Sequence, residues 1–138
     1  MSDYDKIYSI FTQLAIGVDA YALPTTIKEQ IELIKIGVAT YNALKDDNIT
    51  LDEESEKMLN GKGSALDNNE RLLLAHCMLL QIYQRISDEF TSMISVSSKD
   101  IALKDYQYQA KYKRQKVEDE REIIQQLLLR SDEFGVLD

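Results

Sequence analysis

Apolar residues recur at helical spacing through the middle of the chain, from residue 68 to residue 94. Steps of three and four residues place them on one face of an α-helix: Leu72, Ala75, Leu79, Ile82, Ile86, Phe90 and Met93. A second set, Leu73, Cys77 and Leu80, widens this face over the first half of the segment. The pattern predicts a central helix that is buried from several sides at its start and has a polar face towards its end.

Capping signals introduce two further helical stripes. Ser2 and Asp5 are spaced as a capping box before a short apolar stripe, and Thr26 and Glu29 form a second box before a stripe that continues to Leu44. Gly37 lies inside the second predicted helix, where glycine is unfavourable. We attribute it to the close approach of a neighbouring helix rather than to a functional hinge.

Two segments do not have a clear helical period. Residues 49–51 are predicted to be briefly extended, and residues 52–59 to form a short acidic helix. Around 94–104, apolar and polar residues alternate on both sides of the sequence SSKD, as in a β-hairpin. The same residues allow Ser97 and Asp100 to form a capping box that opens the last helix directly. We favour an extended or hairpin-like break and keep the second interpretation open.

The last helix is predicted over about residues 105–130, and its middle is polar. Four basic residues are followed by four acidic ones, with Arg121 among them, in the sequence KYKRQKVEDERE. Such a helix is expected to protrude or to pack against the charges of another copy, and residues 131–138 are expected to be a flexible tail. The sequence therefore predicts one mainly α domain over residues 1–138: a small helical bundle of four to five helices, with a possible short β-hairpin around 94–104 and a long C-terminal helix.

Composition narrows the class of protein. The 138 residues include one proline and five glycines, which leaves little room for a many-turned β architecture. The net charge of −8 argues against nucleic acid as the main partner, because phosphate binding needs neutralising cations. No apolar run is long enough to span a membrane, and the N-terminus lacks the layout of a signal peptide. We expect synthesis in a reducing cytoplasm, where the single Cys77 forms no internal disulfide.

Residues capable of catalysis or metal binding are few. The single histidine, His76, lies on an apolar face, and Glu70 precedes it by six residues rather than by the three of a helical di-iron motif. Cys77 has no CxxC partner, and the carboxylates of residues 52–56 are best explained as a solvated face. We expect no enzymatic activity and no catalytic, cofactor-binding or metal-binding residues.

Tyrosines interleaved with lysine and arginine on the last helix indicate a binding surface. These residue types suit both nucleic-acid bases and protein interfaces, and the overall negative charge favours a protein. With the apolar residues of the tail, the predicted interface consists of Tyr106, Tyr108, Lys111, Tyr112, Lys113, Arg114, Lys116, Glu118, Glu120, Phe134, Val136 and Leu137. A helix with one basic and one acidic half could also pair head to tail with its neighbour in a closed ring.

Two stretches carry a resemblance to a known family. The sequences NNERLLLAHCMLL (residues 68–80) and SMISVSSKDIALKDY (residues 92–106) resemble the head–tail connector, or adaptor, proteins of tailed bacteriophages. Those small helical proteins carry an LLLAH-type helix, then an S-x-S-x-x-D-I segment before a long final helix. Lys99 stands where the family has a glycine in the turn.

The resemblance implies a homo-oligomeric ring, commonly of twelve copies, that docks under the portal protein after DNA packaging. Such a ring gives the tail or a stopper protein a platform, and DNA passes through its lumen without specific binding. The protein would be made in the cytoplasm of the host bacterium and end in the neck of the virion, with no membrane involved. The alternative is a cytoplasmic helical regulator that binds a partner protein through the Tyr/Lys/Arg face of the last helix.

Overall fold

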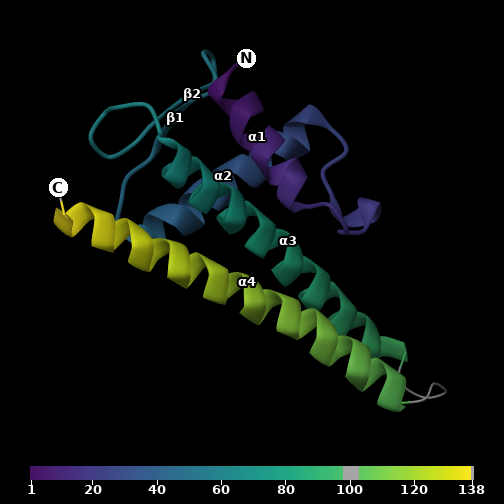
Figure 1. Ribbon diagram of the computed structural model, residues 1–138. Helices are drawn as coiled ribbons and strands as arrows, with labels where there is room; N and C mark the ends of the chain where they lie inside the picture. Colours follow the sequence, from purple (N-terminus) through teal and green to yellow (C-terminus); the bar gives the residue numbers. More distant parts are fainter. Residues whose placement is uncertain (98–102, 138) are drawn as a thin grey trace.

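The computed structural model describes the backbone of residues 1–97 and 103–137, and the side chains of residues 1–93 and 106–130 (Figure 1). Over this part the protein is mainly α-helical, with four α-helices and a small two-stranded sheet, as the sequence predicts. The elements occur in the order α1 (Asp3–Leu14), the 3₁₀ turn η1 (Ala20–Ala22), α2 (Ile27–Lys45), β1 (Thr50–Asp52), β2 (Lys57–Leu59), α3 (Asn68–Ser97) and α4 (Leu103–Leu137).

The two longest helices form an antiparallel pair. Helix α4 lies along α3, while α1 and α2 pack against α3, so the far end of the pair extends beyond the rest of the molecule (Figure 1). The helix that was predicted to protrude alone is therefore supported by α3. Its backbone continues to Leu137, so residues 131–137, predicted as a flexible tail, belong to the helix.

Capping interactions fix the starts of the helices. The Ser2 hydroxyl accepts a hydrogen bond from the Asp5 N–H, and the Asp5 carboxylate accepts one from the Ser2 N–H, which confirms the first predicted capping box. Asp67 and Glu70 form the same arrangement before α3. These reciprocal bonds satisfy backbone donors that have no partner within the helix.

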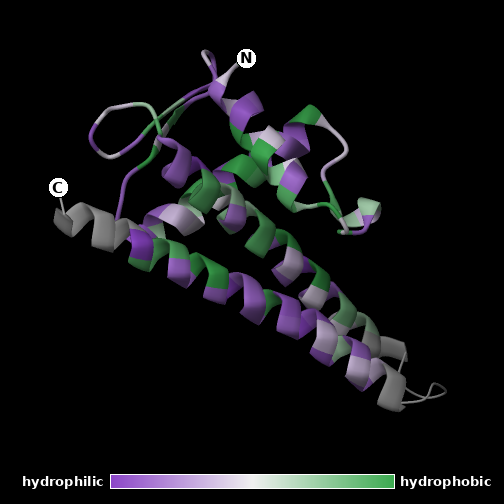
Figure 2. Cartoon of the chain, viewed as in Figure 1, coloured by the Kyte–Doolittle hydropathy of each residue, from purple (hydrophilic) through white to green (hydrophobic). Residues whose placement is uncertain are grey.

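The first half of α3 forms the centre of the core. Its largest fully buried side chains include Leu74, Cys77, Met78 and Ile82, and they lie on several sides of the helix. Figure 2 shows this stretch as mostly hydrophobic, whereas the middle of α4 is hydrophilic. The predicted central helix is thus confirmed, with its burial greatest where the apolar residues occur almost all round.

Gly37 allows α2 to approach α3 closely, as predicted. A Cβ atom at this position would lie 2.4 Å from Cγ of Met78. We expect Gly37→Ala to lower the free energy of unfolding by about 1 kcal/mol, because overpacking outweighs the gain in helix propensity. Urea unfolding would measure it. In a Met78→Ala background, where the opposing atom is gone, the same change should cost nothing; an equal cost in both backgrounds would show that close approach is not the reason for the glycine.

Residues 52–59, which were predicted to form a short acidic helix, instead form the turn and the second strand of a β-hairpin. Strands β1 and β2 are antiparallel, and Leu51 pairs with Met58. The turn forms because the Asp52 carboxylate accepts hydrogen bonds from the N–H groups of Glu54 and Ser55, and because Glu56 adopts a left-handed conformation with φ of 53°. The prediction of a helix was wrong because these local bonds compete with helix formation.

The start of α1 holds this hairpin in place. The Asp3 N–H donates to the Glu56 carbonyl, and the Met58 N–H donates to the Asp3 carboxylate. Met58 is thereby directed into the core, where it is buried. This contact joins residues more than fifty positions apart, so no local sequence pattern predicts it.

The hairpin predicted around 94–104 is wrong in its first half, because residues 94–97 are the end of α3. The apolar stripe of α3 continues at helical spacing, and the ring of Phe90 stacks on that of Tyr106 in α4 at 5.8 Å. This packing favours continued helix up to the reversal of the chain. Residues 98–102, which include Asp100 of the alternative capping box, lie outside the described residues.

Candidate protein interface on the last helix

Helix α4 divides its side chains between an inner and an outer face. Val117, Glu120 and Ile124 are buried against α3 and recur at steps of three and four residues. Tyr108 and Tyr112, four residues apart, are 77% and 59% exposed on the outer face. The helical period therefore separates residues that the linear sequence places together.

The structure sorts the twelve predicted interface residues into four groups. Exposed side chains, available to a partner, are those of Tyr108, Lys111, Tyr112, Arg114, Lys116 and Glu118. Tyr106 and Lys113 are half-buried, and Glu120 is buried. The side chains of Phe134, Val136 and Leu137 lie outside the described part of the structure.

Glu120 is the clear correction, since it has an intramolecular partner. Its Oε1 lies 2.5 Å from Nδ1 of His76 in α3, and the two side chains are only 5% and 12% exposed. Glu120 occupies the face that also carries Val117 and Ile124, so the carboxylate must point towards α3. The same contact gives His76, which the sequence places on an apolar face, a polar partner, and it ties α3 to α4.

Two lysines of the basic segment lie over aromatic rings. Nζ of Lys113 is 5.2 Å from the centre of the Phe90 ring in α3, and Nζ of Lys116 is 5.5 Å from that of Tyr112. Such cation–π contacts contribute roughly 0.5–1 kcal/mol at exposed sites. Lys113 therefore helps to join the two helices, whereas Lys116 and Tyr112 form a joint cationic and aromatic surface on the outside.

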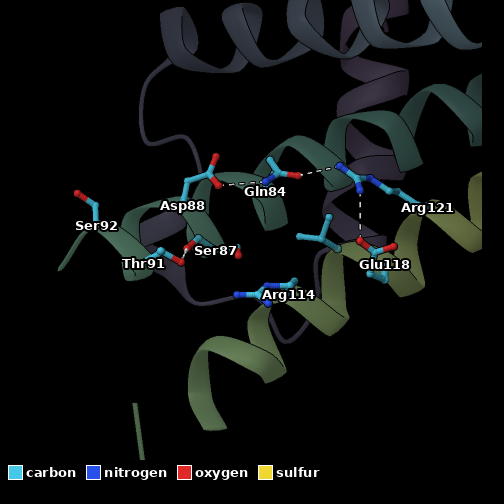
Figure 3. Close-up of a pocket in the computed structure, with 9 residues that line it drawn as sticks. Gln84, Ser87, Asp88, Thr91, Ser92, Arg114, Glu118 and Arg121 are labelled. Atoms are coloured by element: carbon cyan, nitrogen blue, oxygen red, sulfur yellow. Dashed lines mark hydrogen bonds and ion pairs between the residues drawn. The ribbon is translucent and has the colours of Figure 1, made fainter. Parts of the chain in front are cut away.

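A groove of about 570 Å³ runs between α3 and α4 near the far end of the pair (Figure 3). Its lining residues are mostly polar: Gln84, Ser87, Asp88, Thr91, Ser92, Arg114, Val117, Glu118 and Arg121. The buried Val117 lies at its base. The groove is too polar to resemble a pocket for an apolar small molecule.

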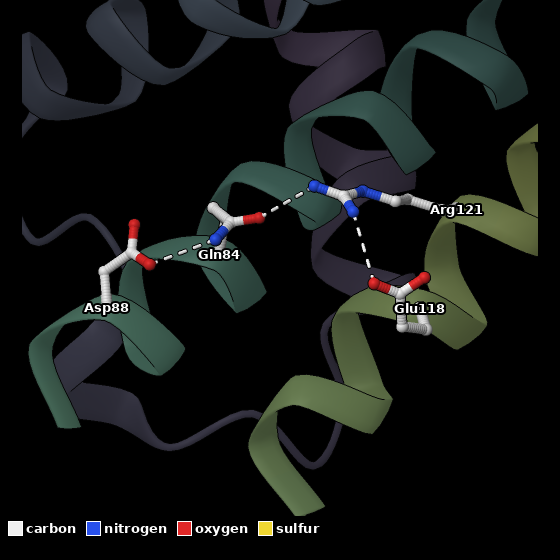
Figure 4. A network of polar contacts seen from close by, with 4 residues as sticks. All are labelled: Gln84, Asp88, Glu118 and Arg121. Carbon is white, nitrogen blue, oxygen red and sulfur yellow. Dashed lines mark hydrogen bonds and ion pairs between the residues drawn. The ribbon is translucent and has the colours of Figure 1, made fainter. Parts of the chain in front are cut away.

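A chain of hydrogen bonds crosses this groove (Figure 4). The side-chain amide of Gln84 donates to the Asp88 carboxylate at 3.1 Å. Arg121 donates at 3.2 Å both to the side-chain amide oxygen of Gln84 and to the Glu118 carboxylate. Both carboxylates that line the groove thus have partners. Arg114 makes no hydrogen bond or ion pair with any residue that the structure describes, so one guanidinium remains available.

A smaller hollow of about 190 Å³ lies on another side of the basic segment, where the loop after α1 meets α3 and α4. Tyr112 and Lys116 line it together with Ile16, which is 83% exposed. Sequence reasoning missed Ile16, because it lies outside the apolar stripe of the first helix. The hollow extends the exposed aromatic surface of α4 onto the neighbouring loop.

Cys77 lies in the core, and burial raises the pKa of its thiol to about 12. Since the thiolate is the reactive form, we expect negligible labelling by a thiol reagent at pH 8 in the folded protein and complete labelling in urea. Mass spectrometry of alkylated protein would measure it. Rapid labelling without denaturant would show that α3 opens frequently under native conditions.

No three or more His, Cys, Asp or Glu side chains among the described residues gather where they could hold a metal ion. No helix within the same residues has the length and apolar character needed to cross a membrane.

The fold and this surface define a small, mainly α-helical protein with one exposed aromatic and charged helix face. The chain belongs to the YomZ prophage protein family, whose model matches residues 1–133. Neither a curated protein nor a solved structure matches it. Family membership makes this a phage-derived protein, in agreement with the phage origin that the two sequence motifs imply.

Proposed function

We propose that this protein is a structural subunit of a phage neck, forming a ring that joins the portal to the tail or to a stopper protein and lets DNA pass. The observation that carries the proposal is the outer face of α4, where Tyr108, Lys111, Tyr112 and Lys116 are all exposed. The membership in a prophage family supports it. In this role the protein is made in the bacterial cytoplasm and ends in the virion, at the head–tail interface.

The outer face has the chemistry of a protein interface. Tyrosine and arginine are over-represented in such interfaces, and tyrosine contributes a large contact area at a low entropic cost. The exposed Tyr108, and the exposed Tyr112 that lines one hollow with Ile16, would gain favourable free energy when a partner covers them. A neighbouring subunit or the portal protein is the partner that this role provides.

The distribution of charge suits a ring around DNA. Lys111, Arg114 and Lys116 are exposed before Val117, whereas exposed carboxylates, among them Glu118 and Glu122, outnumber the exposed Arg121 next to them just after it. Opposite charges on different parts of one surface favour heterologous contacts, which close into a ring when the rotation is suitable. Twelve copies would match the phage connectors. The net charge of −8 would disfavour lasting binding of DNA phosphates in the lumen.

Reconstitution with the portal protein tests the proposal. We expect the purified protein to be a monomer or a weak oligomer and to form rings on the portal, visible by negative-stain electron microscopy. Failure to bind the portal or a tail or stopper protein would overturn the proposal, as would tight binding to duplex DNA at physiological salt. A small stable oligomer that ignores the portal and binds another cytoplasmic protein would favour the alternative, a helical regulator.

A further inference from the structure

We propose that the groove of Figure 3 receives the acidic turn of a second copy of this chain, residues 52–56, with Arg114 as the anchor. This inference rests on the proposed function, because it names the contact between neighbouring subunits. It assigns a receiving surface to α3 and α4 and an inserting element to the β1–β2 hairpin.

The receiving side is prepared for one additional carboxylate. In the hydrogen-bond chain of Figure 4, Asp88 accepts from Gln84 and Glu118 accepts from Arg121, and neither carboxylate makes an ion pair with Arg114. A guanidinium can hold a carboxylate through two parallel hydrogen bonds, which is the geometry that makes arginine frequent at the centre of interfaces. The Ser87 and Thr91 side chains beside it give the groove a polar wall.

The inserting side is a firmly held acidic turn. Asp52, Glu53 and Glu54 are exposed, and the turn is closed by the hydrogen bonds from two backbone N–H groups to the Asp52 carboxylate. The Lys35–Glu53 ion pair ties it to α2. The structure gives the Glu54 carboxylate no partner among the described residues. A turn that is ordered before binding loses little conformational entropy when a partner engages it.

The two surfaces lie at opposite ends of the molecule. The hairpin lies beside the start of α3, whereas the groove is lined by residues 84–92 of α3 and 114–121 of α4 (Figure 1). About twenty helical residues separate them, a distance of roughly 30 Å. The turn therefore cannot reach the groove of its own chain. The contact is between copies and heterologous, as a closed ring requires.

Two other occupants fit the groove less well. Three of the four carboxylates in the acidic segment of α4 are engaged, since Glu118 accepts from Arg121, Asp119 accepts from Gln115, and Glu120 contacts His76. Duplex DNA brings a continuous row of phosphates, which would also meet the carboxylates of Asp88 and Glu118. A turn can place a single carboxylate on Arg114 and avoid both.

Charge reversal in the full-length protein tests the contact. We expect Arg114→Glu and Glu54→Arg each to weaken ring formation on the portal by about tenfold or more, and the two changes together to restore it to within about threefold. Arg130→Glu is the matched control, because it makes the same substitution at an exposed position of the same helix, outside both the groove and the predicted interface. Arg114 and Glu54 are exposed and their side chains have no hydrogen-bond or ion-pair partner among the described residues, so thermal unfolding should verify that both variants remain folded.

Disulfide trapping gives an independent measurement. A chain carrying both Glu54→Cys and Arg114→Cys should form intermolecular ladders on a non-reducing gel after mild oxidation with a copper–phenanthroline catalyst. The pair Glu54→Cys and Arg130→Cys should form far fewer, and the buried Cys77 should contribute none. The trap is applied to the protein alone at high concentration and to the protein with portal.

The outcomes separate the inference from the proposed function. Rings that form on the portal without the ladder, or that are insensitive to Arg114→Glu, would overturn the inference and leave the neck role intact. Absence of both rings and portal binding in the unaltered protein would overturn the neck role, and absence of the ladder at high concentration would then overturn the inference as well. Loss of duplex DNA binding in Arg114→Glu, with assembly unchanged, would make the groove a nucleic-acid site.

Discussion

Glu120→Ala is expected to lower the free energy of unfolding by about 3 kcal/mol. The change removes the partner of His76 at a place where both side chains are almost fully covered. It also leaves a cavity between the buried Val117 and Ile124, and water in that cavity would contact the apolar core. An unpaired polar group and a cavity both destabilise, and here they occur together at the contact between α3 and α4.

Chemical denaturation with urea, followed by circular dichroism, measures this effect. Glu120→Gln should cost less, about 1 kcal/mol, because an amide oxygen still accepts a hydrogen bond. Glu122→Ala is the control on the same helix; its side chain is exposed, so the change should stay within about 0.5 kcal/mol. Equal losses at positions 120 and 122 would show that the pair contributes nothing and that only the helix propensity of α4 matters.

The parts of the fold that depend on local pattern could be predicted from the sequence. The steps of three and four residues from Leu72 onward give the burial of α3, because the face of a helix follows directly from spacing. The Ser2 capping box likewise depends on residues three positions apart. Gly37 could be assigned to a close helix contact because glycine inside a regular stripe has few other structural explanations.

Elements that depend on distant contacts could not be predicted in this way. Residues 52–59 contain several glutamates, which favour helix, yet the bonds from Asp3 and the burial of Met58 select a hairpin. These contacts join residues more than fifty positions apart, so they cannot be predicted from the local sequence. Likewise the alternation around Ile94 and Val96 was less informative than the apolar stripe that precedes it, which keeps α3 helical.

The candidate interface on α4 stays a prediction, and the structure corrects one of its members. Tyr108, Lys111 and Tyr112 are exposed as an interface requires, but charge alone was taken as a sign of exposure at Glu120, which is buried. Its position three residues after Val117 and four before Ile124 carried the contrary signal. If the helical period is applied to polar as well as apolar residues, it places Glu120 on the inner face of α4. A carboxylate can be buried there only because it pairs with His76.

The double change Tyr108→Ala with Tyr112→Ala is expected to weaken assembly on the portal by about 1,000-fold, since each tyrosine at the centre of an interface contributes roughly 2 kcal/mol. Both rings are largely exposed in the isolated chain, so the stability of the fold should change little beyond the loss of the Lys116 contact with Tyr112. Surface plasmon resonance with immobilised portal protein would measure the affinity, and urea unfolding the stability.

Tyr21→Ala provides the matched control, because Tyr21 is also highly exposed but lies in η1 and lines neither the groove nor the hollow beside Tyr112. An effect of similar size at Tyr21 would mean that general surface hydrophobicity, not a defined face, drives association. If assembly survives the double change while Arg114→Glu abolishes it, the groove between α3 and α4 supplies the binding free energy and the tyrosines face solvent in the ring. Sensitivity to both would join the two surfaces into one continuous interface around the basic half of α4.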